Sequence, residues 1–71
     1  MTLHETIATA RKAKGLTLRQ LEQATGISNA ALSQIETGWI VDPSFRKIVK
    51  IAQVLGLSLT RLAKEASHET E

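Results

Sequence analysis

Apolar residues recur along this chain at intervals of three and four, the spacing of helices that bury one face. In the first segment, Leu3, Ile7 and Ala10 share a face. Gly15 follows as a C-terminal cap, which predicts a helix from about Leu3 to Lys14. No segment alternates apolar and polar residues with a period of two between turn signals, so no strand is predicted.

One start signal for a helix occurs three times along the chain. Thr17 can cap a helix, and Gln20 three positions later completes a capping box. Ser28 and Ser58 are caps of the same kind, because each directly follows an apolar residue and a second apolar residue lies four positions after the serine. Gly26 ends the segment that starts after Thr17. These signals predict a second helix to about residue 24 or 25, a third after Ser28 and a fifth after Ser58.

A fourth helix is expected after the sequence DPS, because Pro43 cannot lie inside a helix and Ser44 is a good cap. Gly56 follows its last apolar position and is expected to end it. The expected inward stripe of this helix consists of Phe45, Ile48, Val49, Ala52 and Leu55. Ile51 and Val54 lie outside that stripe.

The third helix has an outer face of small groups and amides. On a helical wheel its inward side carries Ala31, Leu32, Ile35 and Glu36. Its outer side carries Asn29, Ala30, Ser33, Gln34 and Thr37. Surface helices usually expose charged residues, whereas this face has no Lys, no Asp and no long apolar side chain. The second and third helices are short and joined by the tight turn TGI, which is typical of a helix-turn-helix over about residues 17–36.

In a helix-turn-helix, the second helix enters the major groove of DNA. Asn29 and Gln34 can each form a bidentate pair with adenine. Ala30 and Ser33 allow close approach, and Ala30 can contact a thymine methyl, so these four residues are the predicted base readers. The predicted contacts to the DNA backbone, several of them at helix N-termini, are Thr17, Arg19, Ser28, Thr37 and Ser44. An exposed amphipathic helix without this role remains the alternative from the wheel alone.

The stretch GLTLRQLEQATGISNAALSQIETG, followed by Pro43 and IVKIAQVLGLSLTRL, resembles the phage repressor and Cro-type, or Xre-type, helix-turn-helix family. The resemblance runs from about Ile7 to Leu62. It implies a compact, all-α, five-helix, lambda-repressor-like domain, expected here over residues 1–65. Residues 66–71, ASHETE, are expected from their own sequence to form a frayed acidic tail. The resemblance also implies a bacterial or phage regulator that binds a near-palindromic operator as a homodimer.

Family members often pair an arginine late in the first helix with a glutamate late in the third. The matching positions hold Arg11 and Glu36, and the wheel places Glu36 on the inward side, where a carboxylate needs a partner. An ion pair between Arg11 and Glu36 is therefore expected. A surface pair that contributes little is the alternative.

Some positions depart from the family pattern. Leu18 replaces a glutamine that contacts a phosphate in family members, and Glu22, where alanine is common, is expected to be exposed or locally paired. The loop after the third helix is WIVDP instead of basic or polar. Its apolar residues can fold back on the fourth helix, and Trp39 can lie along a sugar–phosphate wall. The candidates for dimer or partner contacts are Trp39, Ile40, Val41, Ile51, Val54, Leu57 and Leu59.

Composition and charge narrow the function classes. The chain has no cysteine, and its two histidines, His4 and His68, lie near opposite ends, so neither a metal site nor another cofactor is expected. Up to Lys64, nine basic residues face four acidic ones, a balance of +5 that suits an anionic partner. A mixed, solvated surface is the alternative explanation of this charge.

Several function classes have no support in the sequence. No apolar run approaches the length of a membrane span and the N-terminus does not resemble a signal peptide, so a cytoplasmic protein is expected. An enzyme is not expected, because no carboxylate pair, nucleophile–base arrangement or Gly-rich phosphate loop is present. The leading prediction is a sequence-specific, double-stranded-DNA-binding transcriptional regulator, a repressor or small controller. The alternative is a protein-interaction module, an antitoxin or adaptor, with little DNA affinity.

Overall fold

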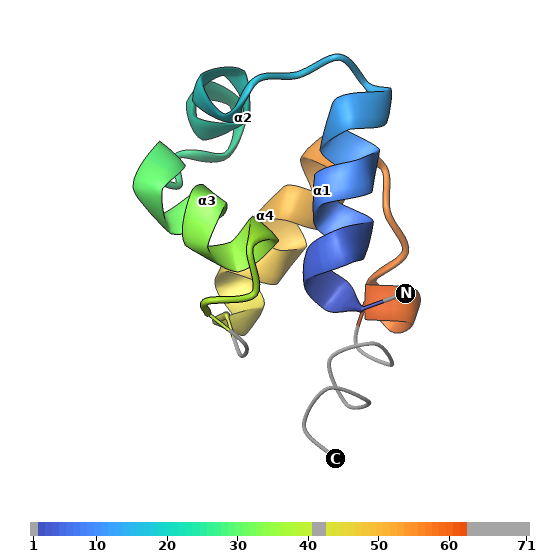
Figure 1. Ribbon diagram of the computed structural model, residues 1–71. Helices are drawn as coiled ribbons and strands as arrows, with labels where there is room; N and C mark the ends of the chain where they lie inside the picture. The colour runs from blue at the N-terminus through green and yellow to red at the C-terminus, as the bar shows by residue number, and fades with distance from the viewer. Residues whose placement is uncertain (1, 41–42, 63–71) are drawn as a thin grey trace.

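The computed structural model describes residues 2–40 and 43–62 (Figure 1). Its helices are α1 (Leu3–Ala13), α2 (Leu18–Thr25), α3 (Asn29–Glu36) and α4 (Phe45–Leu55). Residues 59–62 form a further helical segment, and no strand occurs within the two described ranges. The predicted all-α architecture with a helix-turn-helix in α2 and α3 is confirmed.

The helix-turn-helix formed by α2 and α3 lies at one side of the molecule. α2 and α3 form the left-hand side in Figure 1, while α1 and α4 form the centre. α3 packs against α1 and α2, and α4 also packs against α1 and α2. The two short helices are therefore supported by the two longer ones, and one side of α3 remains at the surface.

The helix boundaries follow from the caps that the sequence contains. The Thr17 hydroxyl accepts a hydrogen bond from Gln20 N at 3.1 Å, and Gln20 Oε1 accepts one from Thr17 N at 2.8 Å. Gly26 ends α2 with φ of +77°, a left-handed conformation that glycine adopts without steric cost. α1 ends at Ala13, one residue before the position expected.

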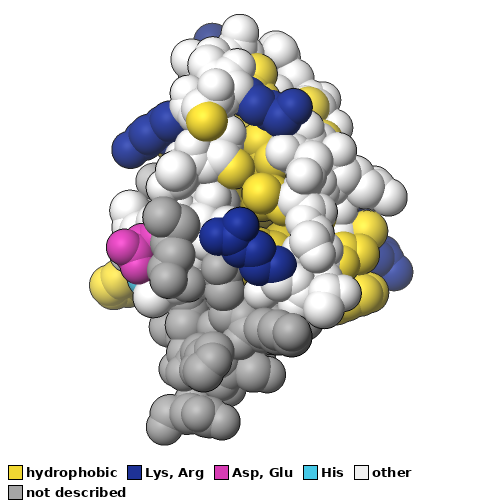
Figure 2. Space-filling model, turned by 90° about the vertical axis from the view of Figure 1, so that its right-hand side faces the viewer, with side chains coloured by type: hydrophobic (Ala, Val, Ile, Leu, Met, Phe, Trp, Pro, Cys, Tyr) yellow, Lys and Arg dark blue, Asp and Glu magenta, His cyan; other side chains and the backbone are white. Residues whose placement is uncertain are grey.

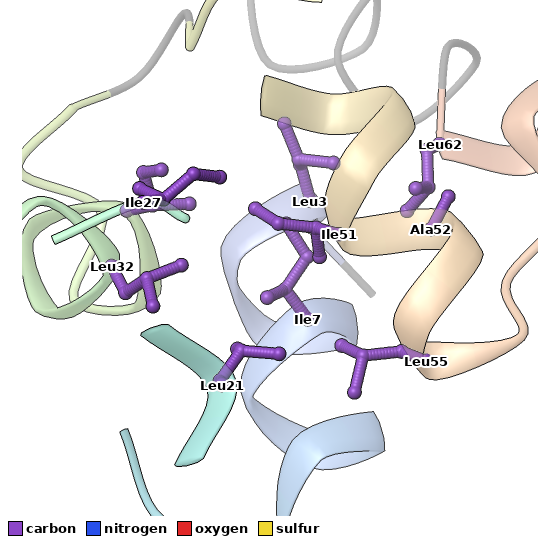
Figure 3. Close-up of a cluster of buried hydrophobic side chains, with 10 residues drawn as sticks. Leu3, Ile7, Leu21, Ile27, Leu32, Ile51, Ala52, Leu55 and Leu62 are labelled. Carbon is purple, nitrogen blue, oxygen red and sulfur yellow. The ribbon is translucent and has the colours of Figure 1, made fainter. Parts of the chain in front are cut away.

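A single apolar cluster joins all the helical segments (Figure 3). Its buried members are Leu3, Ile7, Leu21, Ile27, Leu32, Ile35, Ile51, Ala52, Leu55 and Leu62. Leu62 is fully buried, so the segment 59–62 completes the core. With no disulfide available, this packing must provide most of the stability.

Three expectations for α4 were wrong. Val54 was placed outside the inward stripe, yet it is partly buried and packs against the core cluster. Ile51 was placed outside the inward stripe, yet it is 0% exposed and lies between Leu3 and Ile7 of α1 in Figure 3. Phe45 was placed inside the stripe, yet it is 75% exposed. The buried arc of α4 is wider than one stripe, because α1 covers Ile51 while Leu62 lies near Ala52. Phe45 is the first helical residue, and its Cα–Cβ bond tilts toward the helix N-terminus, beyond the edge of the core.

Candidate nucleic-acid interface

α3 separates cleanly into a core face and a solvent face. Leu32 and Ile35 are buried at 0% and 1% exposure. The outer residues Asn29, Ala30, Gln34 and Thr37 are exposed, and Ser33 is half-buried. The amide-bearing side that was predicted to read bases is therefore open to solvent.

The turn between α2 and α3 is fixed by side-chain and backbone hydrogen bonds. The Thr25 hydroxyl donates to Leu21 O at 2.7 Å and accepts from Ile27 N at 3.2 Å. Gly26 N donates to Glu22 O at 2.7 Å. Thr25 and Ile27 are both buried, so the turn is anchored in the core. The role of Thr25 was missed by sequence reasoning, although a Thr directly before a capping Gly was its available signal.

The expected ion pair between Arg11 and Glu36 is present at the junction of α1 and α3. Arg11 Nε donates to Glu36 Oε2 at 2.7 Å, and Nη2 donates to Oε1 at 3.0 Å. A third bond runs from Arg11 Nη1 to Leu16 O at 2.6 Å. The side chains are 12% and 8% exposed, and hydrogen bonding to Glu36 raises the pKa of Arg11. This geometry fixes the C-terminal end of α3 against α1.

The predicted phosphate contacts lie at the surface: Thr17, Arg19, Ser28, Thr37 and Ser44. The hydroxyls of Thr17, Ser28 and Ser44 accept backbone hydrogen bonds at the starts of α2, α3 and α4. Each of these hydroxyls still has its O–H to donate to a phosphate oxygen. The Thr37 hydroxyl instead donates to Gln34 O at 3.3 Å, and it must rotate before it can bind a phosphate.

Two departures from the family pattern have a structural explanation. Leu18 is half-buried and packs against the core, so it serves the fold instead of a phosphate. Glu22 is half-buried and accepts a hydrogen bond from Asn29 Nδ2 at 3.3 Å. The carboxylate is thus locally paired with a predicted base reader, a contact that sequence reasoning did not assign.

The candidate dimer or partner contacts fall into distinct groups. Trp39 and Leu59 are 79% and 39% exposed, and Phe45 joins them as a further exposed apolar side chain. The residues Ile40, Val54 and Leu57 are partly buried against the core. The prediction that Ile51 contacts a partner was wrong, because its side chain is completely buried in the core. Val41 lies outside the described residues.

Positive charge is not confined to the α3 side. Figure 2 shows the opposite side of the molecule, where Lys and Arg side chains are distributed around a line of hydrophobic groups. Charge alone therefore does not single out one face, whereas the division of α3 into a buried and an exposed side does define a candidate face. No helix within the described ranges is both long and apolar enough to cross a membrane.

A family model described as helix-turn-helix matches residues 7–62. This chain belongs to the helix-turn-helix family. The resemblance to Cro-type and Xre-type regulators is thereby confirmed, and the matched range contains α2, α3 and α4.

Two curated relatives from Bacillus subtilis (strain 168) are similar to this family member. The HTH-type transcriptional regulator SinR is 38% identical over 61 residues, which are 86% of this chain and 54% of SinR. The HTH-type transcriptional regulator SlrR is 38% identical over 52 residues, which are 73% of this chain and 34% of SlrR. The chain thus spans about half or less of the length of these relatives. No solved structure gave a significant match.

Proposed function

We propose that this chain is a sequence-specific transcriptional regulator that binds double-stranded DNA with α3 in the major groove. The observation that carries the proposal is the division of α3, with Leu32 and Ile35 in the core and the amides of Asn29 and Gln34 in solvent. Each amide offers a donor beside an acceptor, which matches the N7 and N6 edge of adenine. The names of both relatives support regulation of transcription.

The remaining contacts surround this reading face. Ala30 and Ser33 are small enough for close approach, and Ala30 suits a thymine methyl. Backbone contacts are proposed for the surface residues at the helix starts and beside α3: Thr17, Arg19, Ser28, Thr37 and Ser44. These contacts orient α3, while the base contacts select the sequence.

We also propose that two copies bind one near-palindromic operator. One α3 covers only a half-site, so symmetric recognition requires a second copy. Leu59 is 39% exposed, and Val54 and Leu57 are partly buried near the same end of the chain, which makes them candidates for the contact between copies. Repression is the simplest regulatory outcome, because occupancy of DNA that the polymerase needs is sufficient.

Selection of bound duplexes from a random library tests this function. We expect a near-palindromic site with half-sites about 10 base pairs apart. Affinity should fall steeply as salt rises, because phosphate contacts release counterions. Failure to enrich any duplex, at low salt and with folded protein, would refute the proposal.

A protein-interaction module is the second candidate, because two large aromatic side chains lie in solvent. Trp39 is 79% exposed and Phe45 is 75% exposed, and both lie close in sequence to the link between α3 and α4. Exposed aromatic groups are common centres of protein interfaces. Trp39 is the only tryptophan, so its fluorescence reports directly on its burial. A blue shift with a partner protein, together with no binding to DNA, would favour this candidate.

A further inference from the structure

We infer that Glu22 sets the base preference of Asn29 by holding its side-chain amide in one orientation. This inference rests on the proposed function, because it assigns a positioning residue to the DNA-reading face. Asn29 Nδ2 donates to Glu22 Oε1 at 3.3 Å across the turn between α2 and α3. Glu22 is half-buried, whereas Asn29 is exposed at the start of α3.

The local backbone keeps the two residues within reach of each other. Glu22 lies in the last turn of α2, and its carbonyl accepts the Gly26 N–H at 2.7 Å. Asn29 is the first residue of α3, directly after the Ser28 cap. The anchored turn between them therefore fixes the distance over which the carboxylate must reach.

Hydrogen-bond accounting gives this contact a consequence for sequence recognition. The asparagine amide has two N–H donors and one carbonyl acceptor. Glu22 occupies one N–H, which leaves one donor and one acceptor for DNA. Adenine presents N7 as an acceptor and N6 as a donor, so it matches the remaining pair. Guanine presents two acceptors, N7 and O6, and only one of them can be satisfied.

The carboxylate also affects binding to every sequence. A negative charge beside the groove repels the phosphates, so Glu22 lowers affinity regardless of the bases. A small alanine at this position would remove both the repulsion and the orientation of Asn29. Glu22 therefore exchanges overall affinity for discrimination between adenine and guanine at the position that Asn29 reads.

The base pair that Asn29 reads is first located as the position where Asn29→Ala relaxes selection. The test then compares two duplexes that differ only in that base pair. Glu22→Ala is expected to lower the ratio of adenine to guanine affinity by about threefold to tenfold, the range for loss of one hydrogen bond. Both affinities should rise. Glu22→Met, which keeps the side-chain length but has no acceptor oxygen, should give the same result if Glu22→Ala folds poorly.

Glu22→Gln is the matched control, because it keeps an oxygen that accepts from Asn29 and removes only the charge. It should raise both affinities and preserve the ratio. In the Asn29→Ala background, Glu22→Ala should leave the ratio unchanged, since the side chain through which Glu22 acts is gone.

Two results would overturn the inference alone: an unchanged ratio in Glu22→Ala and Glu22→Met, or the same change of ratio in the Asn29→Ala background. The second result would mean that Glu22 itself contacts a base. If the unmodified chain selects no duplex at all, the proposed function fails first, and the inference fails with it. Thermal melting of each variant identifies losses caused by unfolding.

Discussion

Replacing Glu36 with alanine removes both oxygens that Arg11 binds at the junction of α1 and α3. Arg11 Nε and Nη2 lose partners at 2.7 and 3.0 Å, while the bond from Nη1 to Leu16 O at 2.6 Å remains. The Arg11 side chain is only 12% exposed, so its charge is left in a partly dry site without a counter-ion. Breaking a buried pair on one side costs about 3–5 kcal/mol. We expect the lower end, about 3 kcal/mol, because Arg11 keeps one hydrogen bond and some solvent.

Thermal unfolding followed by circular dichroism measures this loss. For a domain of this size, each kcal/mol moves the Tm by about 4–8 °C, so we expect a decrease of about 12–24 °C. Since Glu36 raises the pKa of Arg11, the stabilisation that Arg11 gains is complete below its ordinary pKa. It is lost only as the pH rises through the higher folded value. The same decrease in Tm is therefore expected from pH 7 to about pH 10.

A double variant separates the charge effect from packing. Arg11→Met combined with Glu36→Leu replaces the pair with apolar groups of similar size, and its stability should lie within about 1 kcal/mol of the original. The reasoning is refuted if Glu36→Ala alone changes the unfolding free energy by less than about 1 kcal/mol, the range of a solvated surface pair.

Other variants test the reading face and the core. Gln34→Ala should cost about 1–3 kcal/mol of binding free energy on the best DNA site and relax selection at one base position, measured by titration. An equal loss of affinity on random DNA, or a similar loss in the exposed control Gln53→Ala, would contradict a base-reading role for Gln34. Ile51→Ala should lower the unfolding free energy by about 2–5 kcal/mol in denaturant titrations. Phe45→Ala should change the unfolding free energy by less than about 0.5 kcal/mol, because the ring is 75% exposed. Equal losses of stability in Ile51→Ala and Phe45→Ala would contradict the difference in burial between the two side chains. Thr6→Val should raise stability by about 1 kcal/mol, since the buried hydroxyl has no hydrogen-bond partner among the described residues; a decrease in Tm would argue against this.

The sequence predicted the helices well because their ends are encoded locally. Thr17 and Ser28 cap the helices that follow them, and Gly26 ends α2 in a left-handed conformation. The outer face of α3 was also predictable, since Leu32 and Ile35 leave only one orientation for a helix of this length. The local signals and the tertiary packing agree at these positions.

The errors arise where distant segments decide the outcome. The burial of Ile51 depends on α1, and no pattern within α4 contains that information. The hydrogen bond between Glu22 and Asn29 depends on the angle between α2 and α3. The amino-acid types in the turn do not by themselves determine that angle. Trp39 was recognised as unusual, but its exposure had to be read from the structure.

The separation of the two faces of α3 has a practical consequence for retargeting. The side chains of Ala30 and Gln34 are exposed and lie outside the core cluster, so an engineer can exchange them to seek new operators while leaving the scaffold intact. Asn29 is different, because its amide is coupled to a carboxylate on the preceding helix. A library that randomises Asn29 alone would test new side chains while Glu22 still constrains that position. A library that varies Glu22 and Asn29 together would remove this constraint.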